Sequence, residues 1–419
     1  MTIKAKTVIE QAKSAKQAAS SLACAGTDAK NKALAEIAKA LNAQRKDILN
    51  ANALDLKEAT ESGMASAMQD RLILTDERID SMIQGVKELI ALDDPIGEFI
   101  SMSTRPNGLQ VGKKRVPLGV VAIIYESRPN VTVDSAALCL KAGNAVVLRG
   151  GKEAFNTNMA LMSAMRSALE KTDISADVMH LVQDISRESV TTLMGLTGII
   201  DVLIPRGGAG LIRSVVENAK VPVIETGTGV CHIYVDKAAD LEMAAQIVEN
   251  AKCSRPSVCN AAETLLVHQD VAKASLPLIK AQLDKHNTEL RGDKQTQAIL
   301  GDCVVAATNE DYGIEFLDYV LAIRVVADLD EALAHIRTHG SGHSECIVTE
   351  DYTSAQRFLN EVDAAAVYVN ASTRFTDGGM FGLGAEIGIS TQKMHARGPM
   401  GLRELTCTKF VIYGSGQIR

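Results

Sequence analysis

The chain has 419 residues, 46% hydrophobic and 23% charged, so it can bury a large core and is too long for one compact centre. Its net charge of −7 provides no basic field for a phosphate backbone, so we expect no nucleic-acid partner. The N-terminal residues form no uninterrupted apolar core, and no later run approaches the roughly 18 apolar residues of a spanning helix, so we expect a cytoplasmic protein without membrane contact.

The first part of the chain has helical periodicity. From Ile3 to about Leu92 it is rich in Ala, Lys, Glu and Leu, and apolar residues recur at spacings of three and four, as in Leu34, Ile37 and Leu41. This pattern predicts an N-terminal helical layer.

Two further segments have the alternation of strands. Ser101 to Val116 is interrupted by Pro106, Asn107 and Gly108, which predicts a strand pair joined by a turn. The C-terminal stretch TCTKFVIYGSGQIR alternates like an edge strand. Such a strand could pair with another subunit.

Between these segments, short apolar runs alternate with helical ones. The series begins with GVVAIIYE, VDSAALCLKAG, NAVVLRG and NTNMALMSAMRSALEK, and it continues through the predicted strands HLVQD, DVLIPRG, VPVIETG, HIYVD, ETLLVH and AAVYVN. Repeated βαβ units of this kind predict an α/β fold with parallel sheets.

The eight cysteines are dispersed without a CxxC pair, which disfavours a zinc or disulfide framework. One of them, Cys259, lies where a loop marked by Pro256 enters an apolar strand, and Lys252 and Arg255 are close in sequence. Positive charge near a thiol favours the nucleophilic thiolate. The alternative for any single cysteine is a small buried apolar residue.

A carboxylate also ends a predicted strand. Glu225 follows VPVI and precedes the Gly-rich turn at 226 to 229. Carboxylates at strand ends of open α/β sheets often lie in ligand clefts. The alternative is a solvated turn residue.

Three cations follow predicted strands and are candidates for binding a dinucleotide. Charge-assisted contacts to phosphate or ribose need such cations near the carboxyl ends of strands. The chain lacks a GxGxxG fingerprint after an early strand, since Gly382 to Gly388 has the wrong spacing and lies too late, and it has no GxxxxGK[ST]. The candidates are Arg149, Lys152 and Arg206, the last followed by Gly207 and Gly208 at a turn into a helix.

His335, His339 and His343 have a spacing of four that could bind a metal on one helix face. Gly340 and Gly342 interrupt the helix before the third imidazole, and no carboxylate or thiol motif completes the set. We therefore predict no metal site here, and interpret the segment as a helix C-terminus capped by glycine.

Taken together, these segments resemble the aldehyde dehydrogenase superfamily in the same order along almost the whole chain. The closest match is its γ-glutamyl phosphate reductase branch, through YESRPNVTVDSAALCLKAGNAVVLRGGKEA, NAKCSRPSVCNAAETLLV and RTHGSGHSECIVTED. The resemblance implies two Rossmann-type parallel-sheet domains and a small β oligomerisation element. The implied parts are a cofactor-binding domain at 1–104 and 117–227, a catalytic domain at 228–403, and oligomerisation strands at 105–116 and 404–419.

The resemblance also implies roles for individual residues. Cys259 matches the nucleophile, with Asn260 beside it, and Glu225 matches a Glu before a Gly-rich turn. Glu315 resembles the Glu that contacts the nicotinamide ribose, and Arg149 replaces the lysine that holds the adenosine ribose in many members. In hydrolytic members a base activates water, a step that an acyl phosphate reductase lacks, so Glu225 is either structural or controls water.

One motif departs from the superfamily. The usual oxyanion-stabilising Asn follows a Pro-Trp pair, whereas this chain has Tyr125-Glu126-Ser127 and then Asn130. Ser127 and Asn130 are therefore alternative candidates for completing the oxyanion hole.

The implied reaction is the NADPH-dependent reduction of γ-glutamyl phosphate through a Cys259 thioester, in proline biosynthesis, by a homo-oligomer that an upstream glutamate 5-kinase could supply. Two alternatives remain open: a hydrolytic aldehyde dehydrogenase, and a non-catalytic member of the fold. The candidates for binding the 2′-phosphate of the cofactor are Arg149, Lys152 and Arg206, and those for binding the substrate's anionic groups are Arg255, Arg374 and Arg397.

Overall fold

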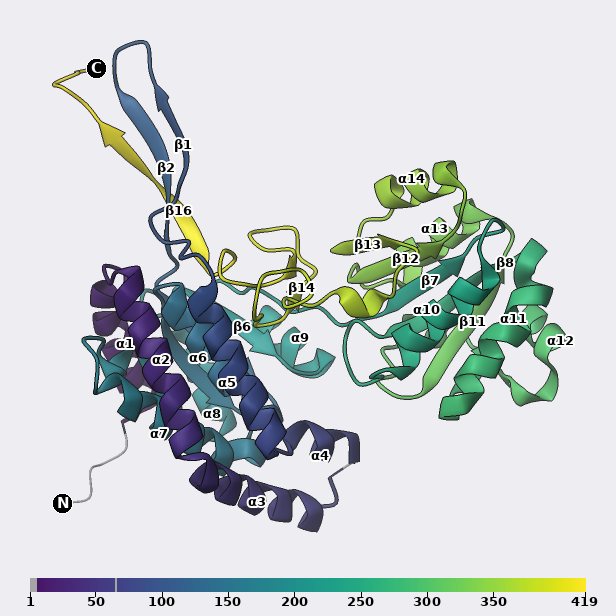
Figure 1. Ribbon diagram of the computed structural model, residues 1–419, viewed down its shortest axis with the longest axis horizontal. Helices are drawn as coiled ribbons and strands as arrows, with labels where there is room; N and C mark the ends of the chain where they lie inside the picture. The colour runs from purple at the N-terminus through teal and green to yellow at the C-terminus, as the bar shows by residue number, and fades with distance from the viewer. Residues whose placement is uncertain (1–5, 65) are drawn as a thin grey trace. The chain divides into compact units, whose positions relative to one another are not determined.

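The computed structural model describes residues 6–64 and 66–419, and the chain divides into two compact units, each of which is described by itself (Figure 1). The first unit comprises the chain up to Thr226 together with Gly382–Gly388 and Met400–Arg419. The second comprises Gly227–Phe381 and Ile389–Pro399.

The main segment of the first unit ends at Thr226, whereas the predicted cofactor-binding domain ends at 227. Two segments that were predicted in the catalytic domain, 382–388 and 400–403, are part of the first unit. The N–H of Ile387 donates to the carbonyl of Met400 at 3.1 Å, and the N–H of Met400 donates to the carbonyl of Gly388 at 2.8 Å. A Cβ on Gly384 would lie 2.6 Å from the Leu92 side chain. These contacts attach both segments to the first unit.

The N-terminal helical layer is confirmed in the described residues, while its predicted start at Ile3 lies outside them. The first helix begins with a capping box, in which the Thr7 hydroxyl accepts from the Glu10 N–H and the Glu10 carboxylate accepts from the Thr7 N–H. The helices are α1 (Val8–Leu22), α2 (Thr27–Ala43), α3 (Arg45–Glu61), α4 (Ser66–Leu72) and α5 (Asp76–Ala91).

A four-stranded parallel sheet follows in the first unit, and all six residues of its strand at 120–125 are buried. Its elements are β3 (Val120–Tyr125), α6 (Pro129–Lys141), β4 (Ala145–Gly150), η1 (Lys152–Ala154), α7 (Phe155–Leu169), η2 (Ala176–Val178), β5 (Met179–Leu181), α8 (Arg187–Gly195), β6 (Val202–Arg206) and α9 (Ala209–Asn218). The strand order is β5-β4-β3-β6.

The prediction of a strand at VPVIETG is wrong. Only Val223 forms an isolated bridge, with Leu203 of β6. Pro222 has no N–H to donate, so the segment makes two hydrogen bonds to Leu203, through the Pro222 carbonyl and the Ile224 N–H, and then turns away. Glu225 therefore follows a bridge rather than a strand.

The turn-linked strand pair and the C-terminal strand form a three-stranded antiparallel sheet with two free edges. Its first strand falls within the range that the sequence assigned to the cofactor-binding domain, whereas the oligomerisation strands were predicted to start at 105. The backbone N–H of Arg115 donates to the carbonyl of Glu98, which extends the pairing before 105. The strands are β1 (Phe99–Thr104), β2 (Gln110–Pro117) and β16 (Thr406–Tyr413), in the order β1-β2-β16.

The second unit contains a seven-stranded parallel sheet. Its elements are β7 (Cys231–Val235), α10 (Leu241–Cys253), β8 (Ala262–His268), α11 (Gln269–Leu283), η3 (Asp284–His286), β9 (Glu289–Gly292), α12 (Lys294–Leu300), η4 (Gly301–Cys303), β10 (Val305–Ala306), η5 (Glu310–Gly313), β11 (Val320–Val326), α13 (Leu329–His339), β12 (Ser344–Val348), α14 (Tyr352–Glu361), β13 (Ala366–Val369) and η6 (Thr373–Phe375). The strand order is β10-β9-β11-β8-β7-β12-β13, and β14 (Ile389–Ser390) pairs separately with β15 (Gly398–Pro399).

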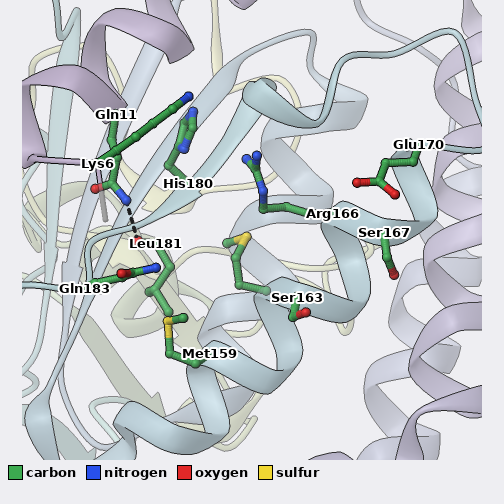
Figure 2. A pocket seen from close by; sticks show the side chains of 11 residues that line it. Lys6, Gln11, Met159, Ser163, Arg166, Ser167, Glu170, His180, Leu181 and Gln183 are labelled. Atoms are coloured by element: carbon green, nitrogen blue, oxygen red, sulfur yellow. Dashed lines mark hydrogen bonds between the residues drawn. The ribbon is translucent and has the colours of Figure 1, made fainter. Parts of the chain in front are cut away.

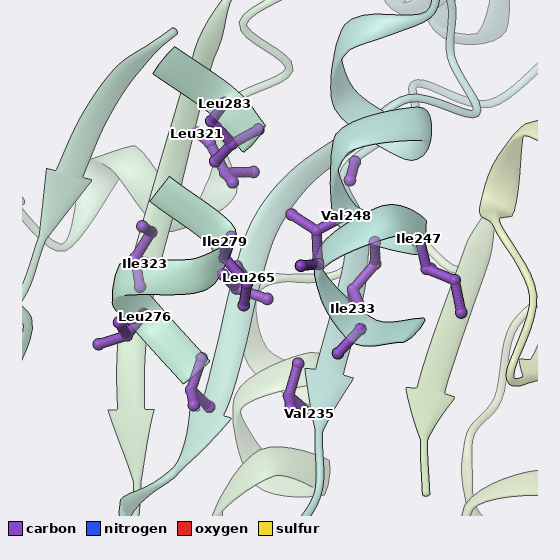
Figure 3. Packing of buried hydrophobic residues seen from close by; sticks show 14 of the residues in the cluster. Ile233, Val235, Ile247, Val248, Leu265, Leu276, Ile279, Leu283, Leu321 and Ile323 are labelled. Atoms are coloured by element: carbon purple, nitrogen blue, oxygen red, sulfur yellow. The ribbon is translucent and has the colours of Figure 1, made fainter. Parts of the chain in front are cut away.

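Helices cover both faces of this sheet, because alternate residues of each buried strand point to opposite sides. One core cluster packs under α10 and α11 and includes Ile233, Val248, Leu265 and Ile279 (Figure 3). The other lies under α13 and α14 and includes Tyr234, Leu266 and Phe358. The α/β fold class is confirmed, and among the described residues no helix is long and apolar enough to cross a membrane.

Candidate active site

The Ser254–Ala261 loop, which joins α10 to β8, carries the partly exposed Cys259. A turn in which the Ala261 N–H donates to the Val258 carbonyl brings the thiol residue to the end of the loop. A Cβ on Gly229 would overlap the carbonyl oxygen of Cys259. The Gly-rich turn therefore needs glycine here so that its backbone can pack directly on the Cys259 loop.

The charge of Arg374, one of the predicted cations, interacts with Cys259. Burial lowers the pKa of Arg374, the neighbouring Arg255 lowers it further, and Cys259 raises it. Arg255 is exposed on the same loop. The two guanidiniums and the thiol therefore lie close enough to interact with one another.

Lys252, by contrast, does not serve the thiol as its place in the sequence suggested. Its ammonium is fully buried and lies 2.6 Å from the Glu263 carboxylate, whose side chain is also fully buried. Burial raises the pKa of Glu263 to about 7, although Lys252 and the Leu317 N–H act in the opposite direction.

Asn260 is held entirely by its neighbours. Its amide nitrogen donates to the carbonyl of Thr376 at 2.9 Å, and its amide oxygen accepts from Arg374. Its backbone carbonyl accepts from the Thr373 hydroxyl at 2.7 Å. Asn260 thus joins η6, and with it Arg374, to the nucleophile loop.

A buried polar network beneath Cys259 was missed by the sequence analysis. The Cys231 thiol donates to the Cys259 carbonyl at 3.2 Å and lies 3.7 Å from Nδ1 of His343. Nδ1 of His343 lies 2.9 Å from the Ser344 hydroxyl oxygen, and the Ser344 hydroxyl is hydrogen-bonded to the Thr376 hydroxyl. Burial raises the pKa of Cys231 well above its ordinary value, which keeps it a protonated donor. No spacing rule connects residues separated by 28 and 112 positions.

The predicted ribose contact, Glu315, lies in the same unit as Cys259. One of its carboxylate oxygens accepts the N–H of Gly229 at 3.0 Å. Because Gly229 packs on the Cys259 carbonyl, Glu315 is one backbone residue removed from the nucleophile.

In the first unit, both oxyanion candidates have protein partners. Ser127 has a left-handed φ of 40°, and its N–H and hydroxyl donate to one oxygen of Glu153 at 2.6 and 2.7 Å. The Asn130 amide donates to Asp134 at 2.9 Å from an exposed position in the first turn of α6. A serine has one O–H and an asparagine amide two N–H groups, so Asn130 retains a donor.

The three cations at the carboxyl ends of β4 and β6 have different surroundings. Arg149 donates to the carbonyls of Gly150, Ile185 and Ser186, at 2.9, 2.5 and 3.1 Å, so it ties down the loop after β5. Lys152 is exposed. Arg206 Nε is buried and has no hydrogen-bond partner among residues 6–64 and 66–419.

The exposed Gly207 and Gly208 precede α9, whose N-cap has no side-chain hydrogen bond, although the Gly208 N–H donates to Glu126 at 3.0 Å. An unsatisfied guanidinium nitrogen beside a helix N-terminus is suited to an anion. These residues therefore fit a cofactor that carries phosphate.

The sequence analysis also predicted Arg397 and Glu225 as site residues. Arg397 pairs with Asp363 at 2.7 Å, and Lys393 binds the other oxygen of that carboxylate. Glu225 is half-buried in the first unit.

Helix α13 ends at His339 with Gly340 at its C-cap, as the sequence predicted. The His335 ring lies 5.5 Å from that of His232 and 4.5 Å from that of His339, measured between centroids. Nδ1 of His335 accepts from Arg324 at 3.2 Å, and His232 bonds to the buried Glu345 at 3.0 Å. This arrangement keeps the His335 imidazole neutral.

A cavity of about 470 Å³ lies in the first unit beside β5 (Figure 2). Its guanidinium, Arg166, is already bound to the carbonyls of Ala176 and Met179 and to Asp177. None of the predicted site residues lines it.

A partly exposed cysteine near two guanidiniums, on a loop of a parallel α/β sheet, is suited to covalent thiol chemistry. The model of the aldehyde dehydrogenase family matches residues 1–308. The chain belongs to the aldehyde dehydrogenase family, whose members are oxidoreductases that use nicotinamide cofactors.

Within the family, the chain is similar to proteins named γ-glutamyl phosphate reductase. That of Carboxydothermus hydrogenoformans is 60% identical over 98% of this chain and 99% of its own length, and that of Clostridium beijerinckii is 57% identical over the same shares. The crystal structure of γ-glutamyl phosphate reductase from Thermotoga maritima superposes with a TM-score of 0.95 and 50% identity, covering 99% of this chain and 100% of that one.

Proposed function

We propose that the chain reduces γ-glutamyl phosphate to glutamate 5-semialdehyde and releases inorganic phosphate, using NADPH, as a step of proline biosynthesis. The observation that carries the proposal is the cluster of Cys259 with Arg374 and Arg255, on a chain similar over its full length to proteins named for this reaction. The small-molecule substrate offers a phosphate and carboxylates, which guanidiniums bind well.

In the first half-reaction the Cys259 thiolate attacks the γ-carbonyl carbon. A tetrahedral oxyanion forms, the C–O bond to phosphate breaks, and a thioester with Cys259 remains. Arg374 and Arg255 are the candidates for holding the leaving phosphate, since both interact with Cys259 or with each other. Arg397, which is paired with Asp363, is the weaker candidate.

In the second half-reaction the thioester carbon accepts a hydride, which a bound nicotinamide supplies. The resulting hemithioacetal collapses to the aldehyde and frees the Cys259 thiolate. Glu315 is the candidate for orienting the nicotinamide ribose. Lys152 and Arg206 are the stronger candidates for the 2′-phosphate, because Arg149 is bound to three carbonyls.

Asn130 is the better oxyanion candidate, because it keeps an amide hydrogen that Ser127 lacks. The acyl phosphate needs no activated water, so we assign Glu225 no proton transfer and leave it a structural or water-controlling role.

We expect the protein to form a homo-oligomer through the three-stranded sheet. Both edges of this sheet are free in the described chain, and β16 exposes Phe410, Ile412 and Tyr413. Exposed edge strands are templates for pairing with another chain. The acyl phosphate itself must come from a kinase that phosphorylates the γ-carboxylate of glutamate.

The test is consumption of NADPH in an assay where a glutamate 5-kinase and ATP supply the unstable substrate. Replacing Cys259 with Ala should lower the rate by at least about a thousandfold while leaving the fold intact. Undiminished turnover by this variant would exclude Cys259 as the nucleophile.

The phosphate dependence of the reverse reaction distinguishes the proposed reductase from a hydrolytic aldehyde dehydrogenase. Oxidation of glutamate 5-semialdehyde in the reverse direction should need inorganic phosphate, because phosphate must attack the thioester. Full oxidation without phosphate would instead support a hydrolytic aldehyde dehydrogenase. A Cys259 thiol that is inert to alkylation would favour a non-catalytic member of the fold.

A further inference from the structure

A buried ion pair closes the nucleophile loop at both of its ends. Lys252 lies in the last turn of α10, just before the loop, and Glu263 is the second residue of β8, just after it. Their charged atoms are 2.6 Å apart, and both side chains are fully buried. The pair therefore fixes the separation of the two points from which the Cys259 loop extends.

The second oxygen of Glu263 reaches a different loop. It accepts the N–H of Leu317 at 3.2 Å, and Leu317 has a left-handed φ of 57°. Lys252 also lies 6.0 Å from the ring centroid of Phe316, whose ring faces Arg291 as well, at 5.1 Å. Glu263 and Lys252 thus hold the backbone and the aromatic side chain that directly follow Glu315.

These contacts form a closed circuit around the thiol. Glu315 accepts the N–H of Gly229, and Gly229 packs on the carbonyl of Cys259. Starting from Cys259, the chain of contacts runs through Gly229, Glu315 and Leu317 to Glu263, and from there returns along β8 to the loop. A displacement of Leu317 therefore moves Glu315 relative to Cys259.

Stability alone does not explain a charged pair at this place. Desolvating two charges can cost as much as their attraction returns, and an apolar pair of similar volume usually serves as well. Leu265 and Val267, which lie on the same side of β8 as Glu263, are apolar and buried. A carboxylate is needed where one side chain must bind both an ammonium and a backbone N–H.

We propose that Lys252 and Glu263 are positioning residues that hold the Glu315 loop in register with Cys259, so that the nicotinamide ribose is placed correctly against the thioester. This inference rests on the proposed function, because it takes Glu315 as the ribose contact. The Glu263 oxygen that accepts the Leu317 N–H is central to this proposal. The Lys252 ammonium neutralises the charge of the Glu263 carboxylate.

The experiment compares two double variants that both lack the buried charges. Lys252→Met with Glu263→Gln keeps an acceptor for the Leu317 N–H, whereas Lys252→Met with Glu263→Met removes it at nearly the same volume. Hydrogen exchange of the Leu317 amide in the cofactor-free protein should accelerate about tenfold in the second variant relative to the first. Its KM for NADPH should rise by a similar factor, while alkylation of Cys259 stays within about threefold.

Equal Leu317 exchange in the two variants, or equal KM values for NADPH, would overturn the inference. The exchange measurement needs no cofactor, so it is independent of the proposed reaction, whose failure would appear as a wild-type chain that consumes no NADPH. If the Met variant does not fold, the unmodified chain provides the test. NADPH should then slow exchange at both Leu317 and Gly229, and protection of neither would contradict the proposal.

Discussion

Gly229 is the residue on which the geometry of the thiol most directly depends. Any side chain at this position would overlap the carbonyl oxygen of Cys259, which is backbone and cannot rotate away. The same residue donates its N–H to Glu315. A single methyl group should therefore displace both the nucleophile and its carboxylate neighbour.

We expect Gly229→Ala to lower kcat by about a hundredfold or more, since misplacing a reacting group by about 1 Å has an effect of this size. Gly313→Ala is the matched control in the same unit, because a Cβ at Gly313 would meet no atom within 4 Å. Steady-state kinetics of both variants, with circular dichroism to check the fold, make the comparison. Equal activities would show that the Cys259 loop tolerates displacement.

Two cations at the carboxyl end of β4, which the sequence analysis treated alike, have different roles in the structure. Arg149 binds the carbonyls of Ile185 and Ser186, so we expect Arg149→Ala to lower the melting temperature of the protein. Lys152 is exposed, so Lys152→Ala should leave the melting temperature unchanged and lower the preference for NADPH over NADH about tenfold. Unchanged discrimination in the Lys152 variant would remove this residue from the cofactor site.

The buried histidine of α13 gives the stability a pH dependence. Burial, together with the charges of His232, His339 and Arg324, lowers the pKa of His335 to about 2. In the unfolded chain the same imidazole titrates near 6.5. Between these two pH values the His335 imidazole binds a proton in the unfolded chain but not in the folded one. The contribution of His335 to the free energy of unfolding is therefore complete above about pH 6.5 and is lost as the pH falls.

The contribution of His335 amounts to at most about 1.4 kcal/mol per pH unit below pH 6.5. We expect urea unfolding, followed by circular dichroism between about pH 5 and 7, to show a smaller pH slope in His335→Gln than in the wild type. The chain contains no tryptophan, so circular dichroism is the suitable probe. Identical slopes would mean that His335 is not buried as a neutral base.

Elements with strong periodicity were predictable from the sequence, and contacts between distant residues were not. The buried runs that became β3, β7 and β8, and the glycine that ends α13, follow from local patterns. VPVIETG has the composition of a strand, but Pro222 and the following turn leave only one bridge. The sequence analysis placed Lys252 near the thiol because the two are close in the sequence. Its actual partner, Glu263, depends on which side of β8 that carboxylate lies, and the sequence spacing does not show this.

For the molecule as a whole, the three-stranded sheet is the most direct test of assembly. Phe410 and Ile412 are two residues apart on β16 and are 66% and 54% exposed, which is expected of a surface that another subunit covers. Replacing both with Lys should shift the protein to a smaller species in analytical ultracentrifugation. Tyr352→Lys, at a 76% exposed position on α14, is the control. An unchanged sedimentation coefficient in the double variant would place the subunit contact elsewhere.

The same sheet also determines when the chain can finish folding. Arg115 in β2 donates to the Thr406 hydroxyl in β16, a residue 291 positions further along. At typical rates of synthesis, the ribosome needs roughly 15 to 60 s to make that stretch. During this time β2 of the nascent chain has one edge without its partner, whereas the second unit, at 227–381 and 389–399, is synthesised before Thr406 and can already fold. A chain released before Thr406 can never complete the sheet, so a truncated polypeptide keeps an open strand edge that chaperones and proteases can recognise.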